Sequence, residues 1–568
     1  MRRRPEGPSD LPSRLESLRK ARPAAAEAEA ALEAAASHAP GDAGTLARLH
    51  EALLFLRAYP HSPRVLSLAD EALGSIGGHV ARLADGGEDL SPLDDPAVSG
   101  LVGVPIAMPF SWAAASWLAR RDPDRLRVDW DAEDLPDRLA AFLPRLVPGL
   151  EEQARVDANV PFRDYVDAAR GTEPDAAWLV GSLDALSYPF SVKAELWEAT
   201  GLQLSWRPRP TDSRGLARFP SPAPFCSDAP LLSRRDVSVA AELAAAPPPL
   251  VRLSPRQGAA VLDSARAAMA VRYRELPAFS SGDPSAVFRA DVGRGVSIFV
   301  TGLWCSERLP LRAGFGTLFA RNGVPVGYGD LHAAFSRADV SFNVFYAFRD
   351  GESAWLYARL LAVCRAVTGA AQLSVDPYQV GLGNEEAISS GAFWFYRKLG
   401  FRSSDPSLER LAAREEAHLA ASPGRRTSSA TLRRLTTAPL LYDVPGETCA
   451  LPDTFHLRDL VLTAARRMAA SGLSPDAFRE RATRRVARAL GLHPLSPGES
   501  EALRRLAPLL ALLDDLTTWS PTDKKSLAAL LHAKSGRDER AYLRRLRAHK
   551  RLEAALLHAA TAPSPAIA

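Results

Sequence analysis

Residues 318–328 read LFARNGVPVGY, two short apolar runs on either side of Asn322-Gly323. An Asn-Gly pair between such runs is the strongest local indication of a two-residue hairpin, because both turn residues must adopt positive φ. We therefore predict two paired strands here. A further apolar run, residues 296–300, precedes them and has the length and composition of a buried strand.

The residues that follow this hairpin switch between strand-like and helix-like patterns. Alternating or continuous apolar residues predict further strands over 340–348 and 372–375, and apolar residues at helical spacing predict helices over 353–367 and 389–399. Residues 294–403 are thus expected to run strand, hairpin, strand, helix, strand, helix. That order is typical of a mixed α/β unit.

The chain on both sides of this unit has helical periodicity, interrupted by prolines. We predict an α+β protein in which a mixed-sheet domain is flanked by all-α regions. Its expected parts are a flexible Ala/Pro-rich arm (1–44), a helical domain (45–206), a Pro-rich linker (207–250), the α/β domain (251–405) and a basic helical C-terminal region (406–568).

The composition excludes several broad classes of protein. The 568 residues are 46% hydrophobic and 24% charged, which is inconsistent with wholesale disorder, a collagen-like repeat or a small disulfide scaffold. The net charge of +4 is too small to indicate a polyanionic partner by itself. The four cysteines lie far apart and lack the spacing of zinc ligands, so we predict no metal site and small buried thiols: Cys226, Cys305, Cys364 and Cys449.

Neither the N-terminus nor the interior predicts a membrane segment. The first residues, MRRRPEG, lead into polar sequence without the apolar core of a signal peptide. Residues 96–119 carry no charge, but Pro105 and Pro109 divide them, which favours a buried segment followed by a helix from about Ser111. We expect a soluble, cytoplasmic protein with no membrane partner.

Residues 391–402, GAFWFYRKLGFR, close the α/β unit. They resemble the last helix and turn of the GNAT superfamily of acyl-CoA-dependent N-acetyltransferases, in which an A-x-x-[LF]-Y-x-K-L-G-F pattern follows the fifth strand. The hairpin at Asn322-Gly323 and the order of the elements resemble that family too. The resemblance is limited to the middle domain, while the layout of the whole chain resembles that of large bacterial proteins.

The resemblance implies acetyl-CoA as acyl donor, held by its pyrophosphate on backbone N–H groups where a strand turns into a helix. The family pattern there is R/Q-x-x-G-x-G/A. Arg349 and Ala354 match its first and last positions, whereas Glu352 replaces the central glycine. A register shifted by one brings Gly351 and Ser353 to the critical places. A plain helix with carboxylates in its first turn explains the same residues.

The resemblance also assigns Tyr396 the role of returning a proton to the departing thiolate of CoA. A phenol is suited to this because its pKa lies just above that of a thiol. The alternative is that Tyr396 belongs to an aromatic helix face packed on the sheet. Ser389 stands where the family often has a cofactor-binding asparagine. Asp376, at the end of a predicted strand, is the candidate general base, although a carboxylate before proline is also a common turn former.

Three interpretations therefore stay open. The first is an acyl-CoA-dependent N-acyltransferase that acts on an unidentified small-molecule or protein amine. The second is a degenerate GNAT-like domain that binds a ligand or protein without chemistry, favoured by Glu352. The third is a helical scaffold that binds nucleic acid weakly through a basic cluster, although we expect a solvated helix face there and no nucleic-acid partner: Arg544, Arg545, Arg547, Lys550 and Arg551.

Overall fold

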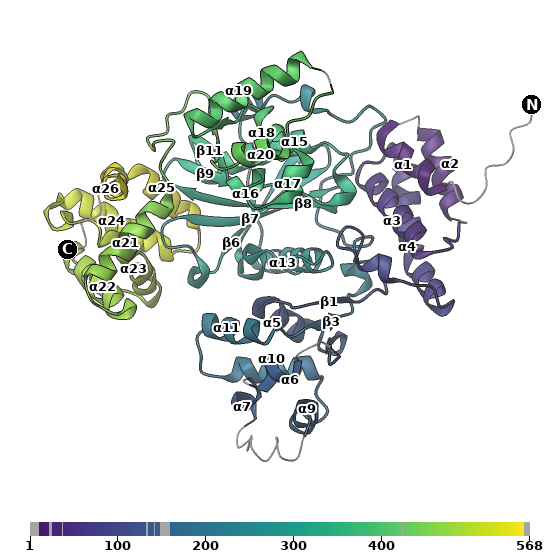
Figure 1. The fold of residues 1–568 in the computed structure, drawn as a ribbon, viewed down its shortest axis with the longest axis horizontal. Helices are drawn as coiled ribbons and strands as arrows, with labels where there is room; N and C mark the ends of the chain where they lie inside the picture. Colours follow the sequence, from purple (N-terminus) through teal and green to yellow (C-terminus); the bar gives the residue numbers. More distant parts are fainter. Residues whose placement is uncertain are drawn as a thin grey trace, which may run out of the picture.

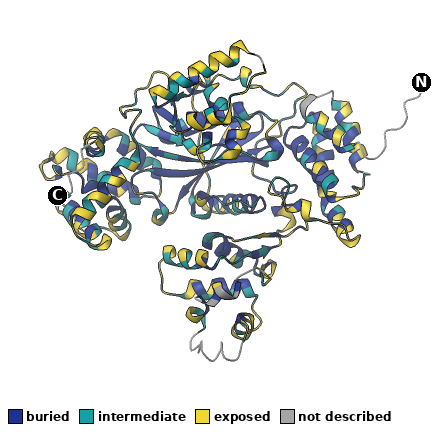
Figure 2. Ribbon diagram, viewed as in Figure 1, coloured by how far each residue is buried: buried dark blue, intermediate teal, exposed yellow. Residues whose placement is uncertain are grey.

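The computed structural model describes residues 11–21, 25–36, 38–131, 135–140, 142–147, 160–422, 424–492 and 494–561. N-terminal helices, a central ten-stranded mixed sheet and a C-terminal helical region follow one another along the chain (Figure 1). The predicted α+β fold class is thereby confirmed. The sheet forms the most continuously buried part of the molecule (Figure 2).

The central sheet is an antiparallel meander joined to a smaller parallel and antiparallel part. Its order is β12-β13-β11-β9-β8-β7-β6-β5-β4, with β10 also paired to β8. Among the described strands, β9 and β11 are the only parallel neighbours. The strands are β4 (Val251–Arg252), β5 (Gly282–Gly293), β6 (Val296–Leu303), β7 (Ala313–Arg321), β8 (Val324–Ala334), β9 (Arg337–Val340), β10 (Asn343–Val344), β11 (Gln372–Val375), β12 (Arg402–Ser403) and β13 (Leu440–Asp443).

The predicted hairpin joins β7 to β8. Arg321 pairs with Val324, and the two residues between them, Asn322 and Gly323, have φ of 48° and 80°. Both values are those of the turn that matches the right-handed twist of paired strands. The local prediction from this dipeptide is confirmed.

Helices cover both faces of the sheet (Figure 1). On one face lie α13 (Pro255–Ala270) and the short α14 (Pro277–Ser280). The opposite face carries α15 (Ser353–Thr368), followed by α16 (Pro377–Val380), α17 (Glu385–Ser390), α18 (Ala392–Arg397), α19 (Pro406–Ala421) and α20 (Ser429–Leu435).

The expected boundary of the sheet domain at residue 405 is wrong. Strand β13 comes 35 residues later, at Leu440–Asp443, and lies between β11 and β12, antiparallel to both. The short run LLYD follows residues with a helical pattern, and this pattern concealed the strand.

The N-terminal arm is also better ordered than we expected. Helices α1 (Leu11–Ala21) and α2 (Ala25–Ala36) pack against α3 (Ala43–Ala58) and α4 (Pro63–Asp85). Leu15, Leu18 and Leu32 are completely or almost completely buried. The small alanine side chains of α2 allow the helices to approach closely. Residues 1–10 of the expected arm lie outside the described residues.

Residues 106–206 form a second hydrophobic core and are not all-α. Three short strands make an antiparallel sheet in the order β1-β3-β2, and each has only three residues, too few for a recognisable pattern. This unit contains β1 (Ile106–Met108), α5 (Trp112–Arg121), β2 (Leu126–Val128), α6 (Leu135–Ala140), α7 (Leu143–Leu146), α9 (Phe162–Arg170), α10 (Asp175–Ala185), α11 (Phe190–Thr200) and β3 (Leu204–Trp206).

The uncharged segment 96–119 contributes to this second core. It contains β1 and most of α5, whose N-cap is Ser111, as predicted. Among the described residues, no helix is both long and apolar enough to cross a membrane.

The Pro-rich residues 207–250 follow an irregular path over the other parts. Their regular elements are the 3-10 turns η4 (Pro210–Asp212) and η5 (Arg234–Asp236) and the helix α12 (Val239–Ala244). Arg214 and Phe219 of this segment are buried, so the segment packs against the core rather than leaving a free linker.

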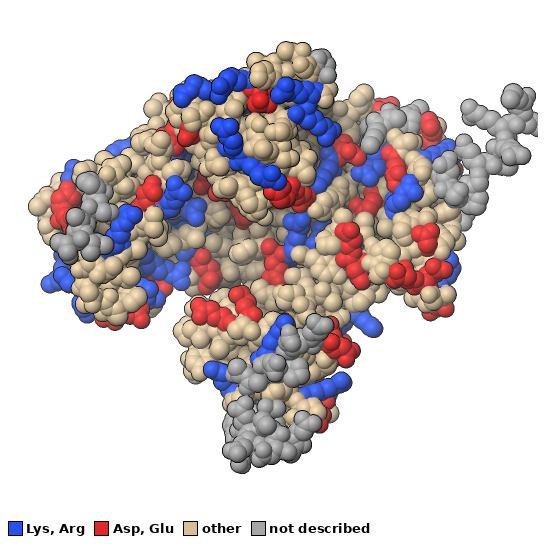
Figure 3. Space-filling view, viewed as in Figure 1, with Lys and Arg blue, Asp and Glu red and all other residues tan. Residues whose placement is uncertain are grey.

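The C-terminal region is helical, and acidic and basic side chains are interspersed over it (Figure 3). Three cations of the basic cluster have intramolecular partners: Arg547 donates to the Gly369 carbonyl, Lys550 pairs with Glu553, and Arg551 pairs with Asp515. The helices are α21 (Leu457–Ala470), α22 (Pro475–Leu490), α23 (Pro497–Leu510), α24 (Pro521–Ser535), α25 (Glu539–Ala548) and α26 (Lys550–Thr561).

Candidate functional site

The sheet opens where its two parallel strands part. Strands β9 and β11 are paired from Arg337 and Gln372 to Asp339 and Ser374. Beyond this point the chain after β9 keeps its antiparallel register with β8 through β10, while the chain after β11 turns away into α16. A gap is left beside β10.

The strand predicted over 340–348 is shorter than expected. Its pairing with β8 continues to Phe345, whose N–H donates to the Val326 carbonyl at 3.0 Å, but residues 346–348 form the 3-10 turn η7 (Tyr346–Phe348). The apolar pattern persists through the turn because Ala347 and Phe348 are buried there too. The pattern therefore did not reveal where the strand ends.

One edge of β10 faces the gap. The N–H groups of Ser341 and Phe345 donate to β8, at 2.9 and 3.0 Å, so those of Phe342 and Val344 point the opposite way by the alternation of an antiparallel ladder. Phe342 N–H donates across the gap to Gln379 Oε1 at 3.4 Å. Among the described residues, the Val344 N–H has no partner. It is a free donor on a strand edge.

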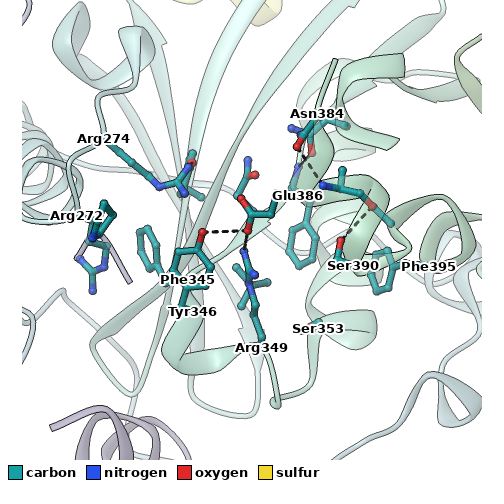
Figure 4. A pocket seen from close by; sticks show the side chains of 18 of the residues that line it. Arg272, Arg274, Phe345, Tyr346, Arg349, Ser353, Asn384, Glu386, Ser390 and Phe395 are labelled. Atoms are coloured by element: carbon teal, nitrogen blue, oxygen red, sulfur yellow. Dashed lines mark hydrogen bonds and ion pairs between the residues drawn. The ribbon is translucent and has the colours of Figure 1, made fainter. Parts of the chain in front are cut away.

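A cavity of about 290 Å³ occupies this gap (Figure 4). Its walls come from the turn after α13, from β8 and β10, from η7 and the start of α15, and from α16 to α18. The lining residues are Pro96, Arg214, Arg272, Arg274, Tyr328, Phe342, Asn343, Val344, Phe345, Tyr346, Arg349, Ser353, Gln379, Asn384, Glu386, Ala387, Ser390, Ala392, Phe395 and Tyr396.

A carboxylate in the middle of the cavity connects two of its walls. Glu386, on α17, accepts hydrogen bonds from the Tyr346 hydroxyl at 3.0 Å and from Arg349 Nη2 at 2.6 Å (Figure 4). The Arg349 guanidinium also stacks on the Tyr346 ring, 4.0 Å from its centroid. The hydrogen bond from Arg349 is the main reason that the pKa of Glu386 lies below its usual value.

Arginines from the turn after α13 line one end of the cavity. Arg274 donates to the Tyr328 hydroxyl at 3.1 Å, and Arg272 stacks on Phe345 with 4.0 Å between its Cζ and the ring centroid. Burial, reinforced by neighbouring Arg214, lowers the pKa of Arg272 well below its usual value. Neither Arg272 nor Arg274 pairs with a carboxylate among the described residues, whereas Arg214 pairs with Glu51 at 2.8 Å.

Tyr396 lines the cavity from α18. It is 3% exposed, and its ring packs edge-on against Tyr357 at 5.3 Å between centroids. Within the described part of the chain its hydroxyl has no hydrogen-bond partner. Burial raises the pKa of this phenol, so it is protonated at neutral pH. The ring of Tyr396 thus packs in the core while its hydroxyl is available as a proton donor.

The helix predicted over 389–399 is two short helices, α17 and α18, separated at Gly391. The φ of Gly391 is +70°, which ends one helix and begins the next at an angle. The break brings Ser390 to the cavity wall, whereas the predicted Ser389 is exposed, donates to the Glu386 carbonyl and is absent from the lining.

Of the residues predicted at the turn into α15, Arg349 and Ser353 line the cavity, whereas Gly351 and Ala354 do not. A Cβ at Gly351 would lie 2.4 Å from the Tyr59 hydroxyl, so the N-terminal helices cover that side of the turn.

Glu352 does not face the expected phosphate site. Its buried carboxylate accepts from Arg294 at 2.5 Å, from Arg321 at 2.6 Å and from the Leu232 N–H at 3.0 Å. The register of the family pattern would place this carboxylate beside a phosphate in the cavity, and the structure places it elsewhere. The backbone at the N-cap turns this side chain inward, toward two arginines that lie far away in the sequence.

Asp376 lies apart from this cavity. It is exposed, caps α16 by accepting from the Tyr378 N–H at 2.8 Å, and lines a second cavity with Asp339, Ser374 and His332. The turn-forming alternative accounts for its contacts. Among the described residues, no three His, Cys, Asp or Glu side chains are grouped to hold a metal ion.

A different carboxyl group neighbours Tyr328, one of the residues that line the cavity. Asp330 is two residues beyond Tyr328 on β8, so both side chains are on the same face of the sheet. Burial raises the pKa of Asp330 to about 6. Asp330, Arg272 and Arg274 were not predicted from the sequence. For Asp330 the available signal is the strand alternation around Tyr328, which indicates a face of the sheet without indicating a cavity.

Comparisons with known proteins do not assign a function to this site. No protein-family model matches the chain, and no curated protein or solved structure is significantly similar to it.

Proposed function

We propose that the cavity beside β10 binds an acyl-CoA, with acetyl-CoA as the simplest donor, and that the protein transfers the acyl group to an amine. The free edge of β10 carries this proposal. An extended chain with amide groups, such as the pantetheine arm of CoA, can pair with such an edge in the manner of an added strand. The resemblance of residues 391–402 to the GNAT superfamily supports the same assignment.

The walls of the cavity supply groups for each part of the reaction. The Val344 N–H lies where it can donate to the thioester oxygen as negative charge develops there. The amine nitrogen forms a bond to the acyl carbon, the C–S bond breaks, and the thiolate takes a proton. Tyr396 is the donor that the resemblance assigns. Its raised pKa keeps it protonated at neutral pH and also makes it a weaker acid toward the thiolate than an exposed tyrosine.

The attacking amine must lose a proton, and we assign Asp330 as its acceptor, because the carboxylate of Glu386 is engaged by Arg349 and Tyr346. With a pKa of about 6, Asp330 is largely ionised at neutral pH, yet it is basic enough to accept a proton, directly or through water. The phosphates of CoA are assigned to the end of the cavity at Ser353, where helix α15 begins, with Arg349 beside it.

Binding of the donor is tested by calorimetric titration of acetyl-CoA and CoA into the full-length chain. We expect a Kd on the order of micromolar, weakened about tenfold by Arg349→Ala, because a charge-assisted contact to phosphate is lost. Arg433→Ala is the matched control. Arg433 also pairs with a glutamate of α17, Glu385 at 2.9 Å, but lies outside the cavity. Absence of binding to the folded chain would refute the proposal.

The free strand edge is tested by Val344→Pro. Because the Val344 N–H points away from β8, this substitution removes the donor without removing a ladder hydrogen bond. We expect a folded protein whose acetyl transfer is about a hundredfold slower, the usual consequence of losing one oxyanion donor. Normal turnover in this variant would exclude the proposed role of β10.

A second function is favoured by the contacts of the N-terminal helices. Arg19 donates to the Ala347 carbonyl at 2.9 Å and pairs with Asp350, and Tyr59 lies against Gly351. These contacts cover one side of the turn and would suit a domain that binds a ligand without chemistry. Tight binding of CoA with no acyl transfer to any amine in a broad screen would favour this function.

A further inference from the structure

We infer that the end of the cavity at Arg272 and Arg274 binds an anionic group, a carboxylate or a phosphate, carried by the amine acceptor. The acceptor's identity as an amine rests on the proposed function. The anion subsite itself rests only on the contacts described below.

Among the described residues, Arg274 has no carboxylate within ion-pair distance, and Glu386 acts on it only at longer range. Arg274 is half-buried, and the only side-chain partner in the described residues is the Tyr328 hydroxyl. A neutral hydroxyl satisfies one of its five N–H donors and none of its charge. The remaining donors are available at the cavity wall.

Arg272 adds a second guanidinium at the same end, and among the described residues no carboxylate contacts it, although Glu51 acts on it at longer range. The Arg272 side chain is 97% buried, and Nη1 donates to the Ala268 carbonyl at 2.6 Å. The Nε and Nη2 atoms have no hydrogen-bond partner in the described residues. A buried guanidinium without hydrogen-bond partners lowers the stability of the folded protein, and an anion bound close to it reduces this loss.

The two carboxylates nearest in effect, Glu51 and Glu386, act on this end only at longer range, because each is in contact with other groups. Glu51 is engaged by Arg214, and Glu386 is engaged by Arg349 and Tyr346. Arg272 and Arg274 thus stand opposite the Ser353 and Ser390 end, with Glu386 between them (Figure 4). The position of Glu386 shows that this cavity already accommodates one carboxylate beside an arginine.

This arrangement limits the acceptor to a small molecule with an amine and an anionic group. The volume of about 290 Å³ leaves little room beyond the acyl arm, and Phe345 and Phe395 supply apolar walls. Amino acids and phosphorylated amines share the required chemistry.

The anion subsite is tested without any turnover. The thermal midpoint of the full-length chain is measured in sodium phosphate and in sodium acetate, with ionic strength balanced by chloride. We expect a rise in at least one of them that Arg274→Gln abolishes and that Arg504→Gln, an exposed arginine of α23, retains. An equal rise in Arg274→Gln would overturn the inference, provided that circular dichroism shows this variant to be folded.

The acceptor class is tested by turnover of acetyl-CoA with L-amino acids and with their amides, which differ only in the carboxylate. We expect the acids to be preferred at least tenfold in kcat/KM, and the preference to disappear in Arg274→Gln. Equal rates for acids and amides would overturn the acceptor class. A phosphate effect lost in Arg274→Gln, without turnover of any substrate, would keep the subsite and refute the proposed function.

Discussion

At the scale of single residues, Glu352 shows how one side chain joins distant parts of the chain. Burial opposes its ionisation, but Arg321 and Arg294 outweigh this and hold the pKa of Glu352 below its usual value. Glu352→Gln leaves two arginines without a counter-ion, so we expect the free energy of unfolding at pH 7 to fall by about 3 kcal/mol. Urea denaturation measures this.

The pH dependence checks the cause of that loss. The folded-state pKa of Glu352 is lower than its pKa in the unfolded chain, about 4.3. Its contribution to the free energy of unfolding is therefore complete above about pH 4.3 and is lost as the pH falls through the folded-state pKa. The difference between wild type and Glu352→Gln should therefore shrink below about pH 4. A difference that stays constant down to acid pH would contradict the ion-pair explanation.

Asp330 is expected to behave in the opposite sense. Its folded-state pKa of about 6 is raised by burial, so the folded protein gives up this proton less readily than the unfolded chain. The contribution of Asp330 to the free energy of unfolding is fully present below about pH 4 and is lost as the pH rises through about 6. We expect Asp330→Asn to be more stable than wild type at pH 7 by about 1–3 kcal/mol.

The comparison requires urea denaturation of both proteins from pH 4 to pH 8. Equal stability at pH 4 and a growing advantage for Asp330→Asn above pH 5 are expected. If Asp330→Asn is the less stable protein at pH 7, its carboxylate has a stabilising partner and the proposed role as proton acceptor loses its basis.

Part of the candidate site was predictable at this scale. Tyr396, Arg349 and Ser353 were singled out by a local resemblance, and the structure brings all three to one cavity. Arg272 and Arg274 were not predictable, because they precede that motif by more than a hundred residues and reach the cavity only through the packing of α13 on the sheet.

At the scale of elements, the break between α17 and α18 depends on Gly391. An alanine Cβ there would meet nothing within 4 Å, so its cost is the strain of positive φ alone. We expect Gly391→Ala to lower the free energy of unfolding by about 1 kcal/mol. Gly472→Ala, at φ of +66° in equally open space, is the matched control and should cost the same. A gain in stability would mean that one continuous helix can form.

Strand β13 is expected to be the element most sensitive to proline. Leu441 pairs with Ser374 on one side and with Arg402 on the other, so it is central in the sheet. Leu441→Pro should abolish cooperative unfolding, because a central strand loses a hydrogen bond and its neighbours lose alignment.

The control for that variant is Arg252→Pro in the edge strand β4. The N–H of Leu253 donates to Val287, so the N–H of Arg252 points away from the sheet. Its replacement should cost about 1 kcal/mol or less. If both variants keep cooperative urea transitions, β13 is not required for the integrity of the sheet.

Elements with several periods of pattern were predicted well, and the hairpin at Asn322-Gly323 and α15 coincide with their predicted positions. Apart from β11 (Gln372–Val375), elements of two to four residues were not. Their existence depends on neighbouring strands rather than on their own sequence, as β13 and the three strands of the second core show.

At the scale of the whole molecule, two hydrophobic cores share helix α13. Ala267, Ala270 and Val271 belong to the core of residues 106–206, while Val261 and Leu262 belong to the core of the sheet. Six of the ten tryptophans lie in or against the smaller core: Trp112, Trp117, Trp130, Trp178, Trp197 and Trp206.

Tryptophan fluorescence therefore reports mainly on the smaller core, and far-ultraviolet circular dichroism on the whole chain. We expect the fluorescence transition in urea to precede the dichroism transition, because the smaller core buries less surface. Val271→Ala, at the junction, should shift the fluorescence midpoint more than Val261→Ala does. Coincident transitions for all three proteins would show that the two cores unfold as one unit.

The late arrival of β13 has a consequence for biosynthesis. A ribosome completes β11 at Val375 and reaches β13 only at Leu440, an interval of roughly 3 to 13 seconds at ordinary rates of elongation. During that interval the nascent sheet ends in an unpaired apolar strand, a template for association with other chains. Newly made copies of this protein therefore have a defined period in which a chaperone that recognises extended apolar segments can bind them, and this period closes when β13 pairs.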